Sequence, residues 1–109
     1  MIHLVIFVKN RDRMNSLKEA MLDILKSSGF KPRIDNLRNL IFFEKYDNEY
    51  KIDFRPANMD KVDGLRPTHY MFDISVDDDE FKEWWMLSCH GSKMVTMPIL
   101  NNFIREGQK

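Results

Sequence analysis

The stretch IHLVIFVKNRDRMNSLKEAMLDILKSSGF, residues 2–30, decides the fold class of this chain. Its opening run IHLVIFV is apolar and rich in branched side chains, which is typical of a strand buried on both faces of a sheet. The apolar residues that follow recur at helical spacing, namely Met14, Leu17, Met21, Ile24 and Leu25. Asn10 or Asp12 can cap the start of this helix, and Gly29 suits its left-handed stop. A strand followed by a helix is the first half of a βαβ unit.

Strands and helices continue to alternate along the rest of the chain. Residues 40–46 and 50–54 form a predicted hairpin with its turn at Asp47-Asn48, and residues 57–67 form a polar loop. Further strands are predicted over residues 68–76 and 92–99, and further helices over residues 77–91 and 100–109. The order β-α-β-β-β-α-β-α favours a single α/β domain over residues 1–109, with helices packed on a mixed sheet. A ferredoxin-like α+β sandwich is the alternative, because this order only partly separates the two architectures.

Composition indicates an ordinary globular domain, with 43% hydrophobic and 31% charged residues. The longest apolar run, Leu4 to Val8, is far too short to span a membrane. We therefore expect no membrane partner. The lone Cys89 cannot form an internal disulfide, which is typical of a cytoplasmic protein. Seventeen basic and seventeen acidic residues cancel, but residues 9–38 carry eight basic against four acidic groups. This modest local excess is interpreted as solvated loop charge, the alternative being a nucleic-acid patch.

Three cations, Lys9, Arg11 and Arg13, stand at the junction between the first strand and the first helix. Cations at a helix N-terminus interact unfavourably with the helix dipole, so they do not stabilise the helix there. An anion at the same place would interact favourably with the backbone N–H groups and with the side chains. The pattern therefore predicts a site for an anion or for nucleic acid, the alternative being solvated charge with Asp12 as the counterion.

Acidic residues crowd a second junction, between the strand at 68–76 and the helix that follows. Asp77, Asp78 and Asp79 suit an N-cap and a first helical turn, so we interpret them as a structural cap. Asp73 stands near the end of the strand, where α/β folds place ligand chemistry. A Mg²⁺ site of Asp73 with Asp77 or Asp78 is the weaker alternative and would make the chain a small metal-dependent enzyme or nuclease-like protein.

The double tryptophan Trp84-Trp85 lies on the helix after these acids. One ring is expected in the core and the other at the rim, where an exposed ring would form part of a partner surface. Cys89-His90 is a poor nucleophile–base pair, because adjacent side chains on a strand or helix point apart. We find no catalytic residues and no cofactor motif in the chain.

The chain resembles the large-subunit ATPases of phage terminases and related P-loop motor proteins. YKIDFRPANMDKVDGLRPTHYMFDIS (50–75) is similar to the segment that leads into their Walker B strand, and LVIFVKNRDRMNSLKEAMLDIL (4–25) to their strand-turn-helix after the nucleotide loop. SKMVTMPI (92–99) is similar to their coupling strand. No G-x-x-x-x-G-K-[ST] loop occurs in these 109 residues, and Ile74 stands where the family has its catalytic Glu.

The resemblance implies a non-hydrolysing relative, of phage or mobile-element origin, whose first strand–helix junction is similar to one that faces DNA. We therefore expect a non-enzymatic binding protein that acts on a nucleic-acid-linked machine or on a host protein. Its partners would be a host or phage protein or nucleic acid, and self-association into a homo-oligomer stays open.

The missing phosphate loop and the missing Glu together predict that the chain shows no micromolar, Mg²⁺-dependent affinity for ATP. Without the loop, no backbone cradle and no hydroxyl ligand hold the phosphates and their Mg²⁺. Titration calorimetry with ATP, in the presence and absence of Mg²⁺, measures this directly. A micromolar affinity that requires Mg²⁺ would contradict the expectation.

Overall fold

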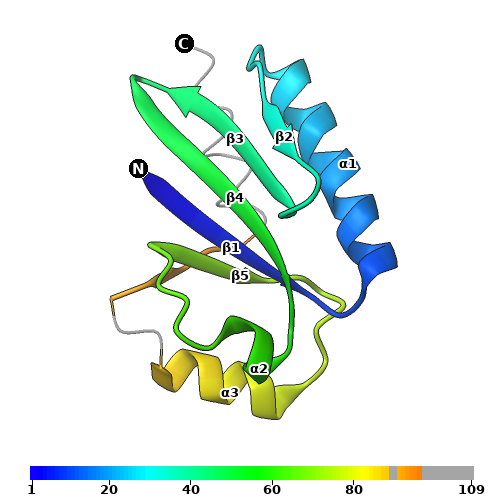
Figure 1. Cartoon of the computed structure of the whole chain (residues 1–109), viewed down its shortest axis with the longest axis vertical. Helices are drawn as coiled ribbons and strands as arrows, with labels where there is room; N and C mark the ends of the chain where they lie inside the picture. Colours follow the sequence, from blue (N-terminus) through cyan, green and yellow to red (C-terminus); the bar gives the residue numbers. More distant parts are fainter. Residues whose placement is uncertain (89–90, 97–109) are drawn as a thin grey trace.

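The computed structural model describes residues 1–88 and 91–96. Within these residues the chain forms one sheet in the strand order β2-β3-β4-β1-β5-β6 (Figure 1). The elements are β1 (Ile2–Val8), α1 (Arg11–Ser27), β2 (Arg33–Asp35), β3 (Leu40–Lys45), β4 (Asn48–Pro56), α2 (Met59–Val62), β5 (His69–Phe72), α3 (Asp79–Ser88) and β6 (Lys93–Met94). Strand β1 is parallel to both β4 and β5, and β6 is parallel to β5. The β2-β3-β4 meander is antiparallel, so the sheet is mixed.

Strand β1 is buried on both faces, as its apolar run predicts. Its even-numbered residues Leu4, Ile6 and Val8 pack with α1, whereas Val5 and Phe7 pack against α2 and α3. The helices therefore cover opposite faces of the sheet, as Figure 1 shows. This arrangement confirms the α/β fold and differs from a ferredoxin-like sandwich, in which the helices lie on one face.

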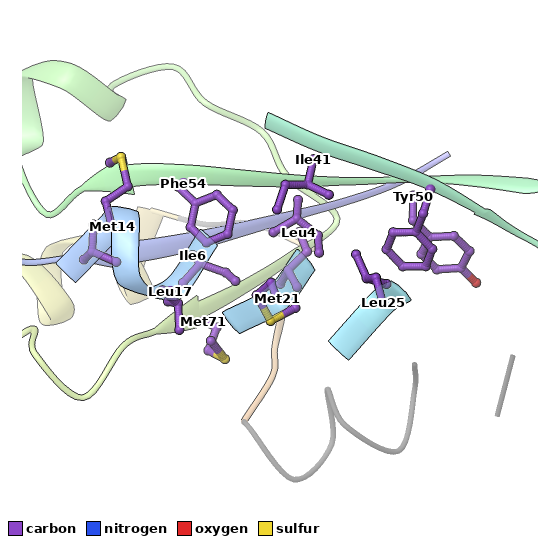
Figure 2. Packing of buried hydrophobic residues seen from close by; sticks show 13 residues of the cluster. Leu4, Ile6, Met14, Leu17, Met21, Leu25, Ile41, Tyr50, Phe54 and Met71 are labelled. Atoms are coloured by element: carbon purple, nitrogen blue, oxygen red, sulfur yellow. The ribbon is translucent and has the colours of Figure 1, made fainter. Parts of the chain in front are cut away.

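The larger core lies between α1 and the sheet (Figure 2). The face of α1 predicted from sequence spacing supplies Met14, Leu17, Met21 and Leu25. Facing side chains come from β1, β3, β4 and β5 and include Ile6, Ile41, Tyr50, Phe54 and Met71. Each such side chain stabilises the fold by roughly 1.5–3 kcal/mol when it leaves water, so this layer fixes α1 against β1 and β4.

The second core is aromatic and fastens α3 to the other face. The Phe7 ring lies 5.1 Å from the Phe81 ring and 4.7 Å from the Trp85 ring, both edge-to-face. Trp85 is buried and Trp84 is half-buried against the same cluster. One tryptophan ring is thus in the core and the other at its rim, as the sequence predicted.

Several boundaries differ from the predicted ones. The hairpin turn is Tyr46-Asp47, one residue earlier than predicted, and both residues have the positive φ that a tight hairpin turn requires. The strand predicted over 68–76 ends at Phe72, because the backbone turns there and the Val76 N–H donates to the Asp73 carbonyl. Strand β2 was not predicted, since its short polar segment shows no alternation.

The polar loop predicted over 57–67 contains the short helix α2, whose start is capped by the Asn58 side chain. The predicted helix over 100–109, the part of the last strand beyond Thr96, and Cys89-His90 lie outside the described residues. None of the helices in the described parts of the chain is long and apolar enough to cross a membrane.

The cap interpretation of the acidic run is confirmed at Asp78, whose Oδ1 accepts a hydrogen bond of 3.1 Å from the Phe81 N–H. Replacing Asp78 with Ala should lower the free energy of unfolding by roughly 0.5–2 kcal/mol, because one N–H of α3 loses its acceptor. Urea denaturation measures the difference. Asp78→Ser should recover most of the loss, since Ser also caps but is a poor Mg²⁺ ligand. A loss that Ser fails to recover would contradict the cap.

Candidate functional site

The parallel strands β1, β4 and β5 end at one edge of the sheet, and the chain leaves that edge in two directions. After β1 it enters α1 on one face, and after β4 it enters α2 on the opposite face. Neighbouring strands whose following helices lie on opposite faces leave a crevice between their carboxyl ends. In open α/β sheets this is where ligands bind, so the β1–β4 edge is the candidate site.

A cavity of about 460 Å³ occupies this edge. Its wall is built from the start of α1, the turn between β2 and β3, the end of β4, and α2. Four cations line it, namely Arg11, Arg38, Arg55 and Lys61, together with apolar groups that include Met14, Phe54 and Leu37. No carboxylate belongs to the lining among the described residues. We call these four cations and the cavity between them the cationic crevice.

The four cations differ in how strongly other side chains neutralise them. Neither Arg11 nor Lys61 takes part in an ion pair within the described part of the chain. Arg38 is exposed and lies 3.9 Å from a carboxylate oxygen of Asp35, a contact too long for a strong hydrogen bond. Arg55 alone is held closely. The crevice therefore keeps a local excess of positive charge in a protein whose formal net charge is zero.

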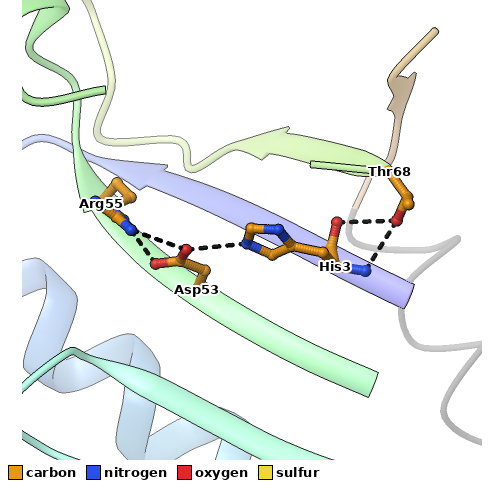
Figure 3. A network of polar contacts seen from close by, with 4 residues as sticks. All are labelled: His3, Asp53, Arg55 and Thr68. Carbon is orange, nitrogen blue, oxygen red and sulfur yellow. Dashed lines mark hydrogen bonds and ion pairs between the residues drawn. The ribbon is translucent and has the colours of Figure 1, made fainter. Parts of the chain in front are cut away.

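Arg55 belongs to a polar network on the sheet face opposite α1 (Figure 3). Its Nε donates to Oδ1 of Asp53 at 2.8 Å and its Nη2 to Oδ2 at 3.2 Å. The Nε2 of His3 lies 2.9 Å from the same Oδ2. Burial acts to raise the pKa of Asp53, but hydrogen bonds to His3 and Arg55 outweigh it, so the pKa is lowered and the carboxylate is charged at neutral pH. An ionised carboxylate only accepts, so Nε2 of His3 carries the hydrogen.

The other two cations of the predicted anion site point toward β5. Arg13 donates from Nε to Oδ2 of Asp73 at 2.6 Å and from Nη2 to Oδ1 at 2.8 Å. Lys9 lies 2.9 Å from Asp77, and both side chains of that pair are more than half exposed. The structure thus separates the predicted trio, because Arg11 lines the cationic crevice while Lys9 and Arg13 pair with carboxylates on the β5 side.

Asp73 is the most strongly perturbed carboxyl at this edge. Burial acts to raise its pKa, but hydrogen bonds from Arg13 and Ser75 outweigh that effect and lower the pKa to about 2. The carboxylate therefore serves as an anchor between the end of β5 and the first turn of α1. No three His, Cys, Asp or Glu side chains gather within residues 1–88 and 91–96 in a way that could hold a metal ion. The three acids considered as metal ligands, Asp73, Asp77 and Asp78, are bonded to Arg13, Lys9 and the α3 backbone.

Sequence reasoning missed Arg38, Arg55 and Lys61 as site residues. The charge excess over residues 9–38 includes Arg38, and so gave a partial signal. Arg55 and Lys61 reach the start of α1 only because β4 lies parallel and adjacent to β1, with Phe7 in register with Arg55. The predicted partner surface at Trp84 and Trp85 lies away from the crevice, and only Trp84 has a partly exposed ring there.

The pair of the partly exposed Arg13 with the buried Asp73 predicts an acid-sensitive part of the folding free energy. The folded-state pKa of Asp73 is below its unfolded value near 4, so its contribution of about 2 kcal/mol is complete above that value and is lost as the pH falls toward 2. Urea unfolding of wild type and Asp73→Asn should differ by that order at pH 7 and converge near pH 2. The exposed pair offers the control, since Asp77→Asn should leave stability nearly unchanged. A gap that stays constant with pH would contradict the assignment.

The fold is similar to part of a phage large terminase. The large terminase of a thermophilic bacteriophage matches 85% of this chain with a TM-score of 0.68 at 14% sequence identity. Another crystal form of the same terminase, in complex with ADP, matches with the same TM-score and coverage at 15% identity. The chain spans about a quarter of the terminase length, 25% and 24% in the two structures. No family model and no curated protein matches the sequence. The resemblance to terminases noted in the sequence is thus confirmed at the level of the fold.

Proposed function

We propose that this chain is a non-enzymatic binding protein whose cationic crevice binds the phosphate groups of nucleic acid. One observation carries the proposal. Arg11, Arg38, Arg55 and Lys61 come from four separate segments and converge on one cavity at the switch point of the sheet. Such convergence brings like charges together, which disfavours the folded state unless an anion binds among them.

The chemistry of these side chains fits phosphate better than an isolated carboxylate. A guanidinium presents parallel N–H groups that match two phosphate oxygens, and a Lys ammonium adds a point charge. Three of the four cations are arginines. The cavity of about 460 Å³ is larger than one phosphate group needs, which suits a backbone that continues past the site. The exposed Leu37 at the rim offers an apolar contact for a sugar or base.

The similarity to a phage large terminase supports a phage-related role in a nucleic-acid-linked machine. A binding role needs no P-loop, so the departures of this sequence from the family do not oppose it. The zero net charge sets a limit on affinity, because no long-range field steers nucleic acid to the crevice. We expect sequence-independent binding in the range of about 10⁻⁴–10⁻⁶ M at physiological salt.

Binding through the crevice predicts a defined salt dependence. Four phosphate contacts give a slope of log K against log salt near −3.6 for duplex DNA, at about −0.9 per contact. Arg11→Gln/Lys61→Gln should weaken binding and flatten the slope by about 1.8, because two contacts are lost. Fluorescence anisotropy with a labelled duplex at several salt concentrations measures both quantities.

The matched control is Lys26→Gln/Lys31→Gln, which removes the same charge near the other end of α1. Lys26 lies about 22 Å along the helix from Arg11, at 1.5 Å per residue, and both lysines are exposed. The control should change affinity little and leave the slope nearly intact. Equal effects of the two double variants would show that net charge, and not the crevice, binds DNA.

A further inference from the structure

Asp53 occupies a position where packing alone favours an apolar residue. It is 1% exposed on β4, in register with Val5 of β1 and Leu40 of β3, both of which are buried and apolar. A carboxylate there loses its hydration, and an apolar side chain of similar volume would often be as stable or more so. The hydrogen-bond partners of Asp53 therefore have to explain why a carboxylate stands at this position.

Its principal partner is a residue of the cationic crevice. Arg55 lies two residues further along β4, on the same face of the sheet, and the two contacts to Asp53 at 2.8 and 3.2 Å fix the plane of its guanidinium. The remaining N–H groups of Arg55 are not used by Asp53, and Arg55 is among the residues that line the crevice. A long side chain held in this way has already lost the rotamer freedom that binding would otherwise remove.

His3 is the second side-chain partner of the Asp53 carboxylate. The Nε2 of His3 contacts Oδ2, the oxygen that also accepts from Nη2 of Arg55. His3 is itself fixed by two backbone bonds to the Thr68 hydroxyl, one through its N–H and one through its carbonyl. Figure 3 shows this row of contacts running from Thr68, just before β5, across β1 to β4. These contacts fix the orientation of the Asp53 carboxylate, and the carboxylate in turn fixes the orientation of the Arg55 guanidinium.

We infer that Asp53 is a positioning residue for the cationic crevice: it holds the Arg55 guanidinium in the orientation that receives a phosphate, without touching the phosphate itself. The inference rests on the proposed function, because the orientation of Arg55 affects affinity only if the crevice binds a polyanion.

The direction in which Asp53→Asn changes the affinity for DNA separates a positioning role from a general electrostatic effect. Removing the negative charge that neighbours Arg55 should tighten the binding of a polyanion if charge alone acts. If Asp53 positions Arg55, Asp53→Asn should instead weaken binding of a labelled DNA duplex roughly two- to tenfold, since Arg55 must then be immobilised on binding. Asp35→Asn is the matched control. The Asp35 carboxylate lies 3.9 Å from the Arg38 guanidinium and accepts from the Arg38 backbone N–H at 3.1 Å, a bond that Asn also accepts, so Asp35→Asn should leave affinity unchanged or slightly tighter.

A second pair of variants keeps the test independent of the stability of Asp53→Asn. Arg55→Lys keeps the positive charge but loses the two-point contact with Asp53, and it should weaken DNA binding by a similar factor. Arg33→Lys is its control and should bind as wild type does, because Arg33 is exposed on β2, lies outside the crevice and is only loosely paired with Glu49 at 3.8 Å. Urea denaturation establishes which variants are folded.

Nuclear magnetic resonance supplies a measurement that needs no ligand. The Nε–Hε group of Arg55 is bonded to Asp53 in the wild type and should give a protected signal, assigned by its loss in Arg55→Lys. A signal equally protected in folded Asp53→Asn overturns the positioning role, as does DNA binding by Arg55→Lys that equals wild type. Wild-type protein that shows no affinity for DNA overturns the proposed function instead, so the two failures are distinguishable.

Discussion

The burial of β1 on both faces is the constraint on which the rest of the structure depends. A strand with apolar side chains on both sides needs a layer on each, and α1 and α3 supply them through two separate cores. The chain must then leave the carboxyl edge of the sheet toward opposite faces. The crevice between β1 and β4 follows from that divergence, and does not depend on any particular ligand.

The same edge is divided into two halves of different electrostatic character. On the β5 side, Asp73 and Asp77 neutralise Arg13 and Lys9, and the Arg13–Asp73 pair joins the first turn of α1 to the end of β5. On the β4 side the cations outnumber the carboxylates near them. The ion pairs of the first half stabilise the frame, and the second half keeps the positive charge to which the proposed function assigns a ligand. This division explains why three cations of one short segment, residues 9–13, do not act together.

The sequence predicted elements with strong periodicity and missed those set by tertiary contacts. The apolar run of β1, the spacing of α1 and the Asp78 cap were all recognisable, because each depends on residues close together in the chain. Strand β2 and helix α2 were not, since neither has enough residues to show a period. Of the site, only Arg11 was predicted and found at the crevice. The positions of Arg55 and Lys61 at the crevice depend on the pairing of β4 with β1, which cannot be predicted from the local sequence.

Three local preferences are opposed at this one edge. Arg11 places a cation in the first turn of α1, against the helix dipole. Asp53 places a carboxylate among apolar neighbours in the middle of the sheet, and four cations line one cavity that, within residues 1–88 and 91–96, has no carboxylate in its lining. Natural sequences break such rules mainly at functional sites. A bound phosphate would interact favourably with the dipole of α1 and with the four cations. The Arg55 guanidinium would receive it in the orientation that Asp53 is proposed to hold. Under the proposed function, a single anion would account for all three departures.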